Sequence, residues 1–111
     1  MALFFQLVVG HVFGDFVFQR SIMATSKSRH AEIYKTASKR FPPWYYWLGS
    51  HAIVHGGMVF LITGSLMFGV IETVLHFVID YCKCEHWIGV HTDQLLHILC
   101  KVAYVYFIMQ M

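Results

Sequence analysis

The sequence predicts an all-α protein, a four-helix transmembrane bundle, and three observations support that class. The 111-residue chain is 58% hydrophobic and only 13% charged, whereas soluble domains carry about 25% charged residues. Its apolar residues gather in four segments separated by polar or turn-forming stretches. Each segment also contains one pair of polar side chains at i, i+4 spacing, which places both on one face of a helix. The length fits a single domain, residues 1–111.

We expect the four helices near residues 2–18, 47–62, 66–81 and 90–109. A membrane span needs about 17 to 25 residues, so the second and third helices are short. The tight link around Gly64 predicts that these two form a helical hairpin. The first apolar run has neither preceding positive residues nor a following small-residue cleavage site. It therefore does not match a signal peptide and is interpreted as a retained membrane span. The three cysteines lack the spacing of a disulfide framework and are expected to be free thiols.

A basic loop, residues 20–44, connects the first two predicted helices. It holds six of the eight lysines and arginines and one acidic residue, Glu32. The positive-inside rule places this loop in the cytoplasm and both termini outside, in a multi-pass protein of the inner (cytoplasmic) membrane. The loop is either an amphipathic helix held by anionic lipid headgroups or a solvated basic segment. The expected partners are therefore the lipid bilayer and its anionic headgroups, and no nucleic acid.

The polar pairs form the candidate site. They are, in chain order, His11 and Asp15, His51 and His55, His76 and Asp80, and Asp93 and His97. Because consecutive helices run in opposite directions, all eight side chains fall within about 14 Å of the helix ends nearest the basic loop, at about 1.5 Å of rise per residue. Polar residues at random positions would not be expected to lie at the same depth along the bundle.

A metal centre is the favoured interpretation of these eight residues. Ionisable groups in apolar helices are costly and usually functional, and helix bundles build metal sites from inward-facing side chains of several helices. Imidazole and carboxylate without thiolate suit zinc, with manganese or iron as alternatives. Eight candidates exceed the four ligands of one zinc ion, so we expect one or two divalent ions, with some residues orienting the ligands. The alternative is a hydrogen-bonded polar core without metal.

Further residues extend these helix faces. Glu72 precedes His76 by one helical turn and is a candidate general base. Glu72 also lies at the same predicted depth as Lys101, which predicts a contact between the two if their helices are neighbours. Gly10 and Gly14 have the small-xxx-small spacing that lets another helix approach closely.

Four motifs resemble those of a family of small bacterial and phage membrane proteins that is filed as a domain of unknown function. They are HVFGDFVFQ, SHAIVH, LHFVIDYCK and TDQLLH, in this order. The resemblance covers nearly the whole chain outside the basic loop, and Leu75 stands where the family commonly has serine. The family is distantly similar to membrane-bound metal-dependent hydrolases. The resemblance therefore implies a metal site on the eight histidines and aspartates named above.

Three functions are compatible with these observations. The favoured one is a metal-dependent hydrolase that acts on a lipid or lipid-linked substrate near the cytoplasmic leaflet, with an aspartate or Glu72 as base. The second is a non-catalytic, metal-stabilised membrane protein of a phage or bacterium that binds or modulates a host membrane protein. The third, ion or proton transport, is least favoured because the far half of the bundle offers few polar residues beyond Glu72 and Lys101. Association into a homo-oligomer is left open.

Overall fold

The computed structural model describes all residues of the chain, 1–111, and is helical throughout without a β-strand. The all-α class predicted from the sequence is therefore confirmed. The helices are α1 (Ala2–Val12), the π-helix η1 (Phe13–Val17), α2 (Ser21–Ser26), the 3-10 helix η2 (Glu32–Lys35), α3 (Trp44–Thr63), α4 (Leu66–Cys84) and α5 (Val90–Gln110).

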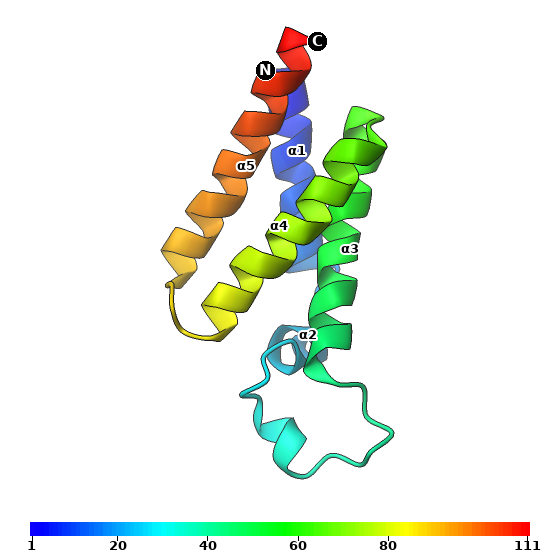
Figure 1. Cartoon of the computed structure of the whole chain (residues 1–111), viewed down its shortest axis with the longest axis vertical. Helices are drawn as coiled ribbons and strands as arrows, with labels where there is room; N and C mark the ends of the chain where they lie inside the picture. The colour runs from blue at the N-terminus through cyan, green and yellow to red at the C-terminus, as the bar shows by residue number, and fades with distance from the viewer.

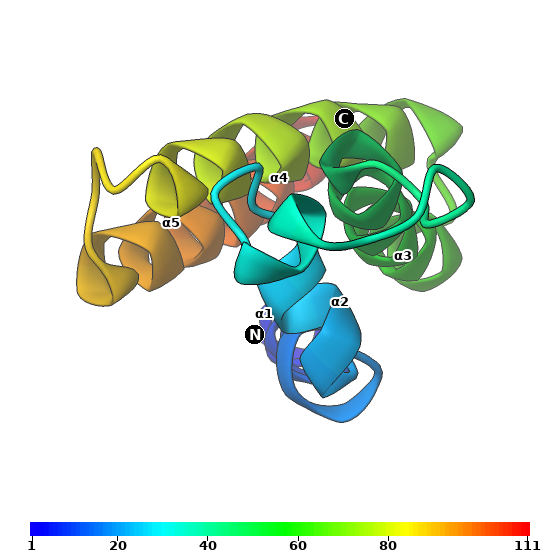
Figure 2. The same cartoon turned by 90° about the horizontal axis from the view of Figure 1, so that it is seen from below.

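Four helices, α1, α3, α4 and α5, form an elongated bundle (Figure 1). Helices α3 and α4 pack along each other as a hairpin, while α1 contacts α3 and α5, and α4 contacts α5. Both chain termini lie at one end of the bundle. Helix α2 and the link between α4 and α5 lie toward the opposite end. Seen from that end, α1 stands apart from the row formed by α4 and α5 (Figure 2).

The turn between α3 and α4 is set by local sequence. Gly64 ends α3 in the left-handed conformation, with φ of 72°, which glycine adopts without a steric penalty. Ser65 then caps α4, because its side chain accepts a hydrogen bond from the Phe68 amide at 3.3 Å. A Cβ atom on Gly56 would lie 2.6 Å from the carbonyl oxygen of Gly69. Glycine at this position therefore permits the close approach of the α3 and α4 backbones.

The interior of the bundle is mainly polar. Twelve of the 22 buried residues are polar or charged. A small apolar cluster, formed by Leu7, Val59, Phe68 and Tyr104, lies beside them. Large apolar side chains such as Leu61 (77% exposed) and Phe5 (69% exposed) instead lie on the surface. Ionisable side chains are rarely buried unless they are paired, so the contacts of this polar interior decide how the bundle is held together.

The predicted integral-membrane location is wrong, and the assignment of four transmembrane spans with it. None of the helices combines the length and the apolar character that crossing a membrane requires. The α-helical part of the first segment has only 11 residues. Acidic and basic residues interrupt α4 and α5, and histidines, glycines and aromatic residues lower the mean hydropathy of α3. The orientation derived from the positive-inside rule, with a cytoplasmic loop and termini outside, depended on those spans and is withdrawn.

The first predicted helix and the basic loop also differ from expectation. The α-helix over residues 2–18 ends at Val12, and the chain continues as the π-helix η1 to Val17. Residues 20–44 contain two short helical segments, α2 and η2, and not one continuous amphipathic helix. Within this segment, Ser26 and Lys27 are buried. The end of α2 is thus docked onto the bundle.

Candidate metal centre

The bundle brings all eight predicted site residues together. Each is at least 91% buried, and Asp15, at 9% exposure, is the least covered of them. They are supplied by α1 and η1 (His11, Asp15), α3 (His51, His55), α4 (His76, Asp80) and α5 (Asp93, His97). Because one i, i+4 pair comes from each of four packed segments, the site depends on tertiary structure and not on one local motif.

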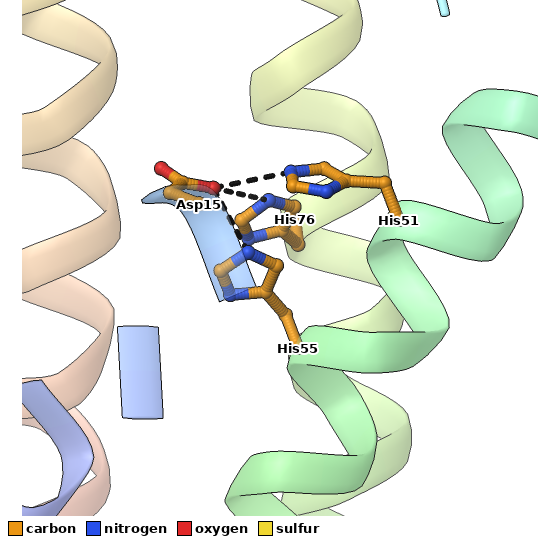
Figure 3. Close-up of side chains that lie close together, drawn as sticks. All are labelled: Asp15, His51, His55 and His76. Atoms are coloured by element: carbon orange, nitrogen blue, oxygen red, sulfur yellow. Dashed lines mark hydrogen bonds and ion pairs between the residues drawn. The ribbon is translucent and has the colours of Figure 1, made fainter. Parts of the chain in front are cut away.

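Asp15 is the hub of the first half of the site (Figure 3). His51 and His55 each donate from Nε2 to Asp15 Oδ1, at 3.1 and 2.9 Å, and Nε2 of His76 lies 3.8 Å from the same oxygen. The other carboxylate oxygen, Oδ2, lies 3.3 Å from Nε2 of His11. Burial opposes ionisation of Asp15, but the hydrogen bonds from His51 and His55 outweigh it and hold the pKa of Asp15 far below its ordinary value.

The π-helix and a glycine place this carboxylate among the rings. Asp15 lies in η1, and π-helical turns, which occur mostly as single-turn insertions in α-helices, are frequent at functional sites. A Cβ atom on Gly14 would lie 2.5 Å from the imidazole of His55. The absence of a side chain at Gly14 therefore allows the His55 ring to reach Asp15.

The histidine rings form a stack through the middle of the site. The centroids of His55 and His76 are 3.7 Å apart, and those of His76 and His97 are 4.1 Å apart. Burial lowers the pKa of His55 to about 4, and burial together with the neighbouring imidazoles lowers the pKa of His76 well below its ordinary value. The rings of both residues are therefore neutral at physiological pH, which is the protonation state that binds metal ions.

Several buried ligand atoms have no hydrogen-bond partner. They include both ring nitrogens of His76 and His97, Nδ1 of His11 and Oδ1 of Asp93. Buried polar atoms in folded proteins are nearly always hydrogen-bonded. Two of the six atoms, His97 Nε2 and Asp93 Oδ1, lie 3.3 Å from each other, and all six belong to residue types that ligate metals. The chemistry of the donor set thus fits a metal ion.

Potential ligand atoms gather in three groups. Within each group they lie within 4.8 Å of one another. The groups are Asp15, His51, His55 and His76; Asp80, Asp93 and His97; and Glu72, His76 and His97. The first two share no residue, whereas the third takes one histidine from each of them. Each of the first two groups could therefore hold an ion without sharing a ligand with the other.

The second half of the site contains two lysines that sequence reasoning did not assign to it. Lys27 Nζ donates to Asp80 Oδ2 at 2.7 Å, and Lys83 Nζ lies 3.1 Å from Asp80 Oδ1. Burial raises the pKa of Asp80, but the two ammonium groups outweigh that effect and hold it at about 2. Lys83 also lies 3.8 Å from Asp93 Oδ2. Lys27 carries no sequence signal, because it is one of six basic residues in the loop.

Gln94, the residue after Asp93, also contacts the site. Its amide nitrogen donates to Asp15 Oδ2 at 3.0 Å, and its amide oxygen accepts from His11 Nε2 at 2.9 Å. The side chain therefore bridges α5 to α1 and η1. A glutamine one residue after a candidate ligand was the available signal, since a residue at i+1 points about 100° away on a helix and can reach a neighbouring helix.

Glu72 is held by a buried ion pair, and the contact predicted between Glu72 and Lys101 is confirmed. Lys101 Nζ donates to both Glu72 oxygens, at 2.6 and 2.9 Å, and Tyr104 adds a hydrogen bond at 3.0 Å. Nδ1 of His76 lies 3.6 Å from Glu72 Oε1. Both oxygens of Glu72 are thus bonded to Lys101, and one of them also faces the His76 ring.

The cysteines lie outside these groups. All three are free thiols, as predicted, and neither Cys82 nor Cys84 belongs to any of the ligand groups. The site is accordingly built from nitrogen and oxygen donors.

The fold and the site together define an all-α protein with a buried histidine–aspartate centre. The chain belongs to the family described as protein of unknown function (DUF3307), whose sequence profile matches residues 3–111. This match confirms the resemblance to a family of unknown function. Comparisons with curated proteins and with solved structures found no match.

Proposed function

We propose that the protein binds one or two divalent transition-metal ions, zinc being favoured, within the histidine–aspartate centre. The observation that carries the proposal is the set of unpartnered nitrogen and oxygen atoms in a fully buried cluster. Leaving such atoms without partners costs about 1–3 kcal/mol each. A metal ion would remove part of that cost, because it accepts one lone pair from each ligating imidazole and neutralises carboxylates.

The first ion would be held by Asp15, His51, His55 and His76. Three imidazoles and one carboxylate from three segments form a four-donor set, the number that zinc takes in structural sites. Manganese or iron would accept the same donors but usually takes additional ligands. Glu72 supports this set from outside, because it faces Nδ1 of His76 and so leaves Nε2 directed at Asp15.

A second ion would be held by Asp80, Asp93 and His97. A set of three protein ligands leaves a coordination position for water or substrate, as in catalytic zinc sites. An ion at such a position lowers the pKa of a bound water and polarises the bond to be cleaved. We therefore propose that the protein is a metal-dependent hydrolase in which the ion held by this second group binds the water and the substrate.

A non-catalytic, metal-stabilised bundle is the second candidate function, and one observation favours it. The side chains of Asp80, Asp93 and His97 are at most 2% exposed, which limits access of a substrate to the centre. In that case metal binding would serve the stability of the bundle, because a site of this kind does not exist in the unfolded chain.

Metal content and hydrolysis can be tested on matched variants. The purified wild type, His55→Ala and His91→Ala should be analysed for metal, with His91 as control because it is an exposed histidine outside the ligand groups. We expect bound metal in the wild type and the control and a reduced amount in His55→Ala. The same samples should be assayed on ester and phosphoester substrates before and after chelation. Metal without any hydrolysis would favour the non-catalytic function, and a wild type that takes up no metal would refute both.

A further inference from the structure

Two ammonium groups converge on the second half of the metal centre from different parts of the chain. Lys27 comes from the segment after α2 and Lys83 from the last turn of α4, and both contact the carboxylate of Asp80. Lys27 is 3% exposed and also donates to Gln19 Oε1 at 2.7 Å, so its side chain is fixed in place. Lys83 also lies 3.8 Å from Asp93 Oδ2. The two lysines therefore balance the charges of the two aspartates in this half of the centre, and a divalent ion bound there would make it positive.

The formal charges of the centre show how metal binding would change its net charge. The centre contains four carboxylates, of Asp15, Glu72, Asp80 and Asp93, and three lysines, at 27, 83 and 101, within ion-pair distance of them. With neutral histidines the sum is −4 + 3 = −1. One divalent ion changes this sum to +1, and two ions change it to +3. A centre that has bound metal is thus positively charged in a buried environment, where an uncompensated charge is strongly unfavourable.

We propose that the metal-bound centre binds a phosphoryl group, with Lys27 and Lys83 as the side chains that hold its oxygens. This inference rests on the proposed function and names the substrate class of the same site. When Asp80 and Asp93 ligate an ion, their negative charge is shared with the metal, and the lysine ammonium groups can turn to an anion. A phosphoryl dianion offers three oxygens to the ion and the two lysines, whereas a carboxylate offers two and half the charge.

Lys83 is the most exposed charged side chain in the second half of the centre. Its side chain is 27% exposed, in contrast to 3% for Lys27 and 2% for Asp80. Lys83 lies 3.8 Å from Asp93 Oδ2. The other oxygen, Asp93 Oδ1, lies 3.3 Å from His97 Nε2, and it and both ring nitrogens of His97 are buried without hydrogen-bond partners. An anion entering beside Lys83 would therefore meet one exposed cation first, then the buried lysine and the ligand group.

Phosphate binding to the zinc-bound protein tests this inference. Inorganic phosphate should be titrated by calorimetry into full-length wild type, Lys83→Gln and Lys35→Gln, each first checked for zinc content and helicity. Lys35 is the control, because its side chain is 71% exposed and paired only with Glu32. We expect binding to the wild type and the control, and binding about tenfold weaker or worse in Lys83→Gln, since a charge-assisted hydrogen bond is lost.

Further titrations separate the sources of the anion. Acetate should bind much more weakly than phosphate, and p-nitrophenyl phosphate should compete with phosphate if a phosphate ester is the natural ligand. Free phosphate binding without such competition would identify the inorganic ion as the ligand. Equal affinity of wild type and Lys83→Gln at equal zinc content, equal affinity for acetate, or no phosphate binding by zinc-bound protein would overturn the inference while leaving the metal site intact. Absence of zinc from the wild type would overturn it together with the proposed function.

Discussion

Replacing Lys101 by methionine tests how the polar interior is stabilised. Lys101 donates to both oxygens of Glu72, and both side chains are about 1% exposed. The substitution keeps much of the side-chain volume but leaves Glu72 with only the Tyr104 hydroxyl as a hydrogen-bond donor. Removing one partner of a buried ion pair costs about 3–5 kcal/mol, because the other charge stays buried without compensation.

The expected result is a large loss of thermal stability with a specific rescue. At about 4 °C or more per kcal/mol for a domain of this size, Lys101→Met should lower the Tm by more than about 10 °C, measured by circular dichroism. The double variant Lys101→Met with Glu72→Gln should recover most of this loss, because neither charge is then buried. The exposed Lys39→Met serves as control. A Tm of Lys101→Met equal to that of the wild type, or a double variant no more stable than the single one, would refute the reasoning.

Two further predictions concern the site and the docked segment. Gly14→Ala places a methyl group 2.5 Å from the His55 ring, so metal content should fall, whereas Gly49→Ala meets open space and should retain it; equal metal content would contradict the packing argument. Glu85 has its pKa lowered to about 2 by hydrogen bonds, chiefly from Arg29. The ionised carboxylate therefore stabilises the fold above the ordinary pKa of 4.5, and this stabilisation is lost as the pH falls toward 2. The difference in Tm between wild type and Glu85→Gln should shrink over that interval. A constant difference would refute the role of the carboxylate.

The gathering of the eight histidine and aspartate side chains in one cluster could be predicted from the sequence, because helical periodicity relates them. The i, i+4 spacing of His76 and Asp80 assigns both to one face, and the alternating direction of the helices brings the pairs to a common level. The same depth argument predicted the contact between Glu72 and Lys101, which the structure contains. Periodicity and depth depend only on regular helices, and the three long helices α3, α4 and α5 are regular.

The features that were missed depend on tertiary contacts or on local irregularity. Lys27 lies in a segment without apolar periodicity, and only the docking of α2 brings it to Asp80. The π-helical turn that carries Asp15 has no signature in composition. The membrane assignment relied on the composition of the whole chain, whereas crossing a membrane depends on each helix separately, and α4 and α5 carry the charged residues of the centre.

X-ray absorption spectroscopy of the zinc-bound protein tests the central claim most directly. If the histidine–aspartate centre is the metal site, the protein should take up one or two zinc ions per chain. The spectrum should then show only nitrogen and oxygen neighbours at about 2.0–2.2 Å, with the scattering pattern of imidazole. His55→Ala should lose part of the imidazole signal, and the three free cysteines should contribute nothing. A sulfur shell at about 2.3 Å, or folded protein that takes up no zinc, would contradict the assignment of the centre.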